Sequence, residues 1–263
     1  MRRRGITWGI ILVVIGLVIL ADNLGLLSPN AWQLLWPLLV IALGLRIMFL
    51  GFFRSSLAAE HLSVPLAGAP TARVLLRHGA GHLDVTDGVA PGLLLDGDFD
   101  GGVEHRETRS SDSLTAELRS GRDAWRDARW DRGRGLDWRV RLGAEAPLAI
   151  DFEGGASENR LDLTRLPVRD LRIKTGASST WVTLPASAGE TQVRVNTGAA
   201  SVNLLVPDGV AARIVSSGAL SSVVVNQSRF PRVGSEWRSP DYDTAVNRAD
   251  ISIEVGVGSV RVD

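Results

Sequence analysis

The 263-residue chain carries 29 basic and 29 acidic residues, so it lacks the net field that would draw nucleic acid or strongly acidic partners. It contains no cysteine, which excludes disulfides, thiolate catalysis and cysteine metal sites. The length allows one or two domains with a real core. We therefore expect no nucleic-acid partner.

Two apolar segments predict a transmembrane hairpin over residues 1–54. Spans at about 6–22 and 32–53 each approach the ~20 residues that cross a hydrocarbon core of about 30 Å. A cleaved signal peptide is the alternative for the first segment, because an arginine triplet precedes it. The hairpin is favoured because the cleavage site is poor and a second span follows closely. The bilayer is the first expected partner.

The charges flanking these spans predict that both termini are cytoplasmic. Arginines precede the first span and follow the second, whereas the connecting loop has neither lysine nor arginine, and positive residues favour the cytoplasmic side. Trp8, Trp32 and Trp36 are expected at the membrane interfaces. Arg46 is expected to snorkel to the inner headgroups, with a buried binding or signalling role as the alternative. The predicted location is the cell membrane, with two spans.

After a linker at 55–63, strand patterns continue over 64–263. Three units, at 171–185, 193–207 and 212–225, each read as a strand, a Gly-Ala corner and a second strand. Their corner glycines, Gly176, Gly198 and Gly218, are 22 and 20 residues apart. A repeat of this length cannot bury its apolar face alone, so the copies must stack. The glycines are expected to allow positive φ and close stacking at the corner.

Looser copies of the unit extend the pattern to both ends of this β domain. A regular array is expected over 146–263 and a less regular part over 64–145, which contains an Arg/Trp-rich insertion at 121–135. The predicted fold is a parallel, β-helix-like solenoid whose windings follow one another in chain order, with a β-sandwich as the alternative. The insertion is read as a solvated loop, or as a basic–aromatic patch. A second insertion at 235–250 is expected to cover an open sheet edge.

The motifs that could carry chemistry are few. Asp96, Asp98, Asp100 and Glu107 fit the spacing of a calcium loop, but their flanks read as strands, so an ordinary turn is preferred. His78 and His82 are four residues apart, although an intervening Gly-Ala-Gly corner argues against a shared metal. No nucleophile–base pair or phosphate loop is evident. We expect no catalytic residue, no metal, no cofactor and no enzymatic activity.

The segment Leu35-Trp-Pro-Leu-Leu-Val-Ile-Ala-Leu-Gly44, followed by the Gly-Ala-Ser units, resembles Lia-type regulators of cell-envelope stress (LiaF-like proteins). The stretches from Val64 to Val85 and from Trp138 to Val262 are similar to the toast-rack β domain of that family. The resemblance implies a membrane accessory protein that holds a sensor kinase inactive. Two alternatives stay open, namely a scaffold that self-assembles as a homo-oligomer and an adhesin-like or lectin-like surface protein.

Overall fold

The computed structural model describes residues 59–121, 136–217 and 222–263. The predicted spans with their interface residues Trp8, Trp32, Trp36 and Arg46, the core of the Arg/Trp-rich insertion, and Gly218 lie outside these ranges. Within them the chain forms strands, turns and irregular segments, which confirms the mainly β class. No described helix is long and apolar enough to span a membrane.

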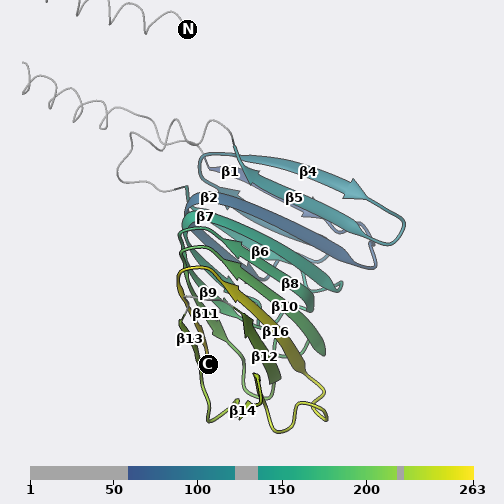
Figure 1. Cartoon of the computed structure of the whole chain (residues 1–263). Coiled ribbons are helices and arrows are strands. Elements are labelled where there is room, and N and C mark those ends of the chain that lie inside the picture. Colours follow the sequence, from purple (N-terminus) through teal and green to yellow (C-terminus); the bar gives the residue numbers. More distant parts are fainter. Residues whose placement is uncertain (1–58, 122–135, 218–221) are drawn as a thin grey trace, which may run out of the picture. The chain divides into compact units, whose positions relative to one another are not determined.

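The described strands form two ladders that meet at a corner (Figure 1). The first ladder contains β2 (Ala72–Asp87), β4 (Val103–Arg109), β5 (Leu114–Ser120), β7 (Leu148–Asp162), β8 (Val168–Thr175), β10 (Glu190–Thr197), β12 (Ala211–Ser217) and β16 (Arg248–Val255). The second adds β1 (Glu60–Pro65), β3 (Leu93–Phe99), β6 (Trp138–Leu142), β9 (Ser179–Thr183), β11 (Ser201–Leu205), β13 (Ser222–Val225) and β17 (Ser259–Val262). The short strands β14 (Arg232–Val233) and β15 (Glu236–Arg238) form a hairpin.

The first ladder runs in the order β5, β2, β7, β8, β10, β16, β12, and all of these pairs are parallel. The antiparallel strand β4 joins it at one end and β15 at the other. The second ladder runs β1, β3, β6, β2, β7, β9, β11, β17, β13, and its pairs are parallel from β6 onward. Strands β2 and β7 pass through the corner and belong to both ladders.

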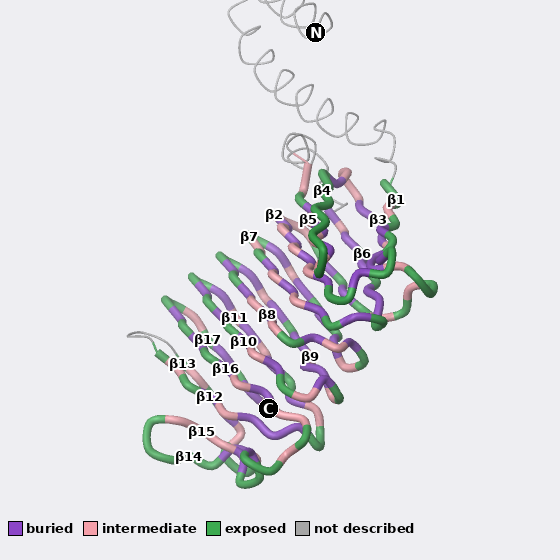
Figure 2. The backbone as a smooth tube through the Cα atoms, turned by 90° about the vertical axis from the view of Figure 1, so that its right-hand side faces the viewer, coloured by how far each residue is buried: buried purple, intermediate pink, exposed green. Residues whose placement is uncertain are grey.

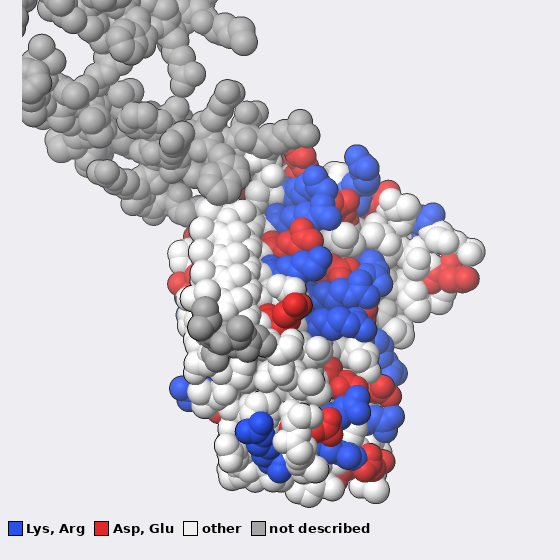
Figure 3. All heavy atoms as spheres, viewed as in Figure 1, with Lys and Arg blue, Asp and Glu red and all other residues white. Residues whose placement is uncertain are grey.

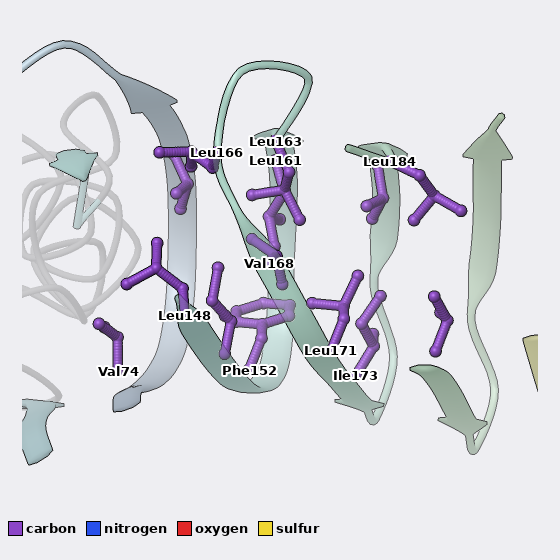
Figure 4. Close-up of a cluster of buried hydrophobic side chains, with 14 of the residues drawn as sticks. Val74, Leu148, Phe152, Leu161, Leu163, Leu166, Val168, Leu171, Ile173 and Leu184 are labelled. Carbon is purple, nitrogen blue, oxygen red and sulfur yellow. The ribbon is translucent and has the colours of Figure 1, made fainter. Parts of the chain in front are cut away.

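The core lies between the two ladders, because alternate residues of each strand point inward. Strand β10, for example, alternates buried and exposed positions along its length (Figure 2). Leu148, Phe152, Leu171 and Ile173 project from successive strands into one apolar cluster and are almost fully buried (Figure 4). Each such side chain contributes roughly 1.5–3 kcal/mol when it leaves water. The stack therefore supplies the burial that a single unit lacks.

The expectation that windings stack in chain order is wrong at the C-terminal end. We call each pair of strands joined by a corner a rung. The last rung in the chain, β16 with β17, lies between the rung of β10 and β11 and the rung of β12 and β13. Ile251 is thus paired with Val193 on one side and with Ile214 on the other. All the units share the same apolar alternation, so any two of them can pair in parallel. The rung that ends the array is consequently β12 with β13.

Two local expectations also differ from the structure. Gly176 and Gly198 lie at their corners without positive φ. A Cβ on either would lie 3.3 Å from a carbonyl oxygen of the neighbouring rung, so close stacking, and not a positive φ, is what favours glycine here. Strand β1 begins at Glu60, inside the segment predicted as linker, because Leu62 packs against the core. Strand β15 does cover part of the edge of β12, as expected for the second insertion.

Candidate functional site

The outer face of the first ladder is covered by ion pairs that cross from strand to strand. Arg73 Nη1 on β2 lies 2.6 Å from Asp151 Oδ2 on β7, and Arg194 on β10 lies 3.0 Å from Asp170 on β8, which also binds Arg172 of its own strand at 2.8 Å. Figure 3 shows the two signs of charge interleaved over this face. Each exposed pair contributes only about 0–1 kcal/mol. The face has no excess positive charge of the kind that binds a phosphate backbone.

A cleft of about 250 Å³ lies beside the corner of β2. In this region β2 pairs with β6 on one side and with β7 on the other. We call this cleft the corner cleft. Its lining residues are His82, Asp84, Asp137, Trp138, Arg139, Glu158 and Arg160. Trp138 is fully buried and packs edge-on against Phe99, with ring centroids 4.9 Å apart. The cleft therefore has a rigid aromatic floor beneath a charged rim.

The rim of the corner cleft presents both signs of charge. His82 Nδ1 lies 3.0 Å from Asp137 Oδ1, and His82 Nε2 lies 3.5 Å from Glu158 Oε2. Arg160 contacts Glu158 at 3.3 Å and also lies 5.7 Å from the ring centroid of Trp181 on β9. Trp181 is 40% exposed. Together these groups offer hydrogen-bond donors, acceptors and an aromatic surface in one place.

A second histidine, His78, is buried on the inner side of the same corner. It is 1% exposed, its ring lies 5.1 Å from that of Trp138, and neither ring nitrogen forms a hydrogen bond with a described side chain. Burial lowers the pKa of His78 from 6.5 to about 4, an effect that the charge of Asp137 and the backbone of Gly81 only partly oppose. His78 is therefore neutral near pH 7, and its charge is costly inside the fold.

The carboxylates of the candidate calcium loop are distributed over separate elements. Asp96 and Asp98 lie on β3, Asp100 lies in the following turn, and Glu107 lies on β4. Strand β3 pairs with β1 and β6, whereas β4 pairs with β5. Among the described residues, no cluster of histidine and carboxylate side chains is arranged to hold a metal ion. The geometry gives the calcium interpretation no support.

The two aspartates of β3 are instead bound to neighbouring side chains. Asp96 accepts a hydrogen bond from Ser63 Oγ at 2.7 Å and pairs with Arg141. The bond from Ser63, followed by the contact and charge of Arg141, lowers the pKa of Asp96. Asp98 Oδ1 lies 2.9 Å from His61 Nδ1. These carboxylates therefore stabilise the packing of β1, β3 and β6 against one another.

Sequence reasoning placed His82 beside a corner but missed the cleft around it, because Asp137, which precedes β6, and Glu158, on β7, are distant from it in the chain. It also passed over Trp181. One signal was available there, since Trp181 occupies the repeat position held by Asn203 and Arg261 in neighbouring rungs. Tryptophan is enriched among the residues that dominate binding at interfaces, so its place at an outward, otherwise polar position makes Trp181 a candidate contact residue.

Two family models match the chain. Residues 54–205 match the family described as the N-terminal domain of toast_rack. Residues 6–48 match the family described as the LiaI-LiaF-like transmembrane region. Together the two matches cover the predicted hairpin and the larger part of the β domain. No curated protein matches the sequence.

Among solved structures, a "putative cell adhesion protein" from Clostridium sporogenes is similar, with a TM-score of 0.68 at 18% identity. The alignment covers 78% of this chain and 97% of that one. An adhesin from Bacteroides fragilis is matched at 6% identity over the same shares of the two chains, with a TM-score of only 0.30, and it carries no argument. The first likeness shows that the two chains share a fold.

Proposed function

This chain belongs to the family described as the N-terminal domain of toast_rack, and we propose that it is a non-enzymatic regulator of cell-envelope stress sensing. It would act by contact with a membrane partner such as a sensor kinase. The observation that carries this proposal is the order of the two matches, a LiaI-LiaF-like transmembrane region followed directly by the β domain. That order attaches a rigid stack of strands to the membrane in which a sensor resides.

The finer topology belongs to the same proposal. Two spans, at about 6–22 and 32–53, would leave both termini and the β domain, as a stacked solenoid, in the cytoplasm. The support is the distribution of arginines, which flank the spans and are missing from the loop between them. In this arrangement the β domain faces the cytoplasmic, catalytic part of a sensor kinase.

The corner cleft with Trp181 is the contact surface that the geometry favours. Tryptophan and arginine dominate binding energy at protein interfaces, and truncation of such an anchor commonly costs 2 kcal/mol or more. The guanidinium of Arg160 lies over the exposed ring of Trp181, 5.7 Å from its centroid, and this contact would order the ring before a partner arrives. Pre-ordering reduces the entropy lost on binding.

The test is a Trp181→Ala substitution in the full chain, read out by a stress-response reporter without envelope damage. We expect basal reporter activity to rise to the level seen when the gene is deleted, because the inhibitory contact is lost. Leu205→Ala is the matched control, since Leu205 is 49% exposed on the adjacent strand β11. Unchanged basal activity in the deletion strain would contradict the regulatory function. Unchanged activity in Trp181→Ala alone would contradict only the contact surface.

An adhesin-like function is the second candidate. Its support is the shared fold with the Clostridium sporogenes protein, which is described as a cell adhesion protein. This function requires the β domain outside the cell, so location separates the two candidates. Protease treatment of spheroplasts should leave the β domain intact if it is cytoplasmic. Its digestion in intact spheroplasts would favour the adhesin.

A further inference from the structure

The sheet edges of this domain are protected at most places. Strand β4 is an edge, and it is exposed and charged from Glu104 to Arg109. The edge strand β1 ends in Pro65 with an irregular register before it. The first half of β12 is covered by β15. Charge, proline and covering segments are the usual devices that prevent an edge from pairing with another chain.

One edge has none of these devices. It consists of residues 215–217 of β12 and 222–225 of β13, which we call the open rung. It contains only valine and serine, and within the described residues no strand pairs with its outer side. Val215 and Val224 are 41% and 47% exposed. The open rung lies at the end of the array opposite β1 and β4 (Figure 1).

The backbone directions of the open rung follow from the bonds at its ends. Ser222 and Asn226 donate their amides to the carbonyls of Gly258 and Val262, at 3.2 and 2.9 Å. Strand residues alternate in direction, so the N–H and C=O of Val223 point away from the array. Ala212 exchanges bonds with Ser239 on the outer side of β12. By the same alternation, the backbone of Ser216 also points outward.

We propose that the open rung pairs with the open rung of a second copy of this chain. A two-fold axis at the level of the neighbouring rung's corner, Gly256-Val257, lays β12 of one copy antiparallel against β13 of the other. The neighbouring rung, β16 with β17, fixes the register of this pairing. Val215 aligns with Ser252, and Val224 aligns with Arg261. Ser252 and Arg261 are equally distant along the chain from the corner at Gly256-Val257. The axis therefore sets Val215 opposite Val224, and Ser216 opposite Val223.

This register agrees with the backbone directions. Ser216 and Val223 are the residues whose amides and carbonyls point outward, and in an antiparallel pair such residues exchange both hydrogen bonds. Val215 and Val224 then form the adjacent pair that shares no backbone hydrogen bond, with Cα atoms about 4.5 Å apart. The same pairing occurs twice, once on each side of the axis.

The charge pattern selects a second copy with this symmetry. A head-to-tail contact would press the uncharged open rung against the charged strand β4, or against the proline-ended β1. A two-fold contact instead joins two uncharged, self-complementary edges, and it closes, so it forms dimers and not filaments. The contact is far smaller than the ~20–30 residues a side of a stable interface. We therefore expect a weak dimer that confinement to a membrane favours.

The test uses cysteine cross-linking in native membranes, for which the chain offers a cysteine-free background. The full-length variant Val215→Cys/Val224→Cys should form a disulfide-linked dimer on mild oxidation, because the adjacent Cα separation suits a disulfide. Neither single variant should do so, since each cysteine would face a valine. Leu205→Cys/Val224→Cys is the matched control with equally exposed positions. Circular dichroism of purified variants verifies the fold.

The expected result is a doubling of mass in the first double variant alone. Monomer in that variant, with the fold intact, overturns the proposal. A dimer with Val224→Cys alone means that β13 pairs with β13, which overturns the register and its two-fold axis. A ladder of larger species means head-to-tail assembly and overturns the closed dimer. An additional Ser216→Pro change, which removes the outward amide, should abolish the cross-link.

Discussion

Replacement of the buried His78 should change how the stability of the β domain depends on pH. The ring is buried against Trp138 and has no described side-chain partner for its nitrogens. Its pKa is about 4 in the folded domain, against 6.5 for an ordinary histidine. As the pH falls, His78 is protonated in the unfolded chain before it is protonated in the folded domain, so acid favours the unfolded state.

The sign and size of the effect follow from these two values. Because the folded pKa is lowered, the stabilisation is fully present above pH 6.5 and is lost as the pH falls toward 4. The complete loss corresponds to about 3 kcal/mol, at about 1.4 kcal/mol per pH unit between the two pKa values. About 2 kcal/mol of it is lost by roughly pH 5. This is a large share of the stability of a typical domain.

The measurement is urea unfolding of the unit Ser56–Asp263 at neutral and acidic pH. The difference in free energy of unfolding between the wild type and His78→Leu isolates the contribution of the histidine, because the carboxylates are the same in both proteins. We expect the wild type to lose about 2 kcal/mol more than the variant between pH 7.5 and 5. His105→Gln, an exposed change on β4, should behave like the wild type. Parallel pH profiles for wild type and His78→Leu would refute the reasoning.

Three further outcomes are expected. Thr197→Val should raise the free energy of unfolding by about 1 kcal/mol, because the buried hydroxyl lacks a hydrogen bond and Val255 holds the paired position. A lower free energy of unfolding in urea for this variant would show that the Thr197 hydroxyl does form a hydrogen bond in the folded domain. Gly155→Ala should cost roughly 2–3 kcal/mol, since its Cβ would lie 2.2 Å from the carbonyl oxygen of Gly79, whereas Gly176→Ala, at 3.3 Å, should cost less. Equal costs in thermal unfolding would contradict the stacking argument. Calcium should leave the melting temperature unchanged, because Asp96 is already bound by neighbouring side chains. A higher melting temperature in calcium would support the calcium-loop interpretation instead.

Several features of this protein could be read from the sequence because they are local. The alternation around Ile173 and Val195 defines a strand with one inward face, and Gly176 and Gly198 mark where each strand must turn. These patterns involve residues within one unit, so neither the neighbours nor the order of stacking is needed to recognise them. The mainly β class follows from them, and the spacing of the glycines further indicates that units lie one upon another.

The order of the rungs, the corner cleft and the open rung depended on tertiary structure. Strand β16 can pair with β10 or β12 because every unit presents the same apolar alternation, and only the completed packing places it between them. Burial of His78 and convergence of Asp137 and Glu158 on His82 join residues that are distant in the chain. Short-range patterns determine where strands and corners form. Which strands become neighbours, and which edge stays unpaired, is determined by contacts that exist only after the chain has folded.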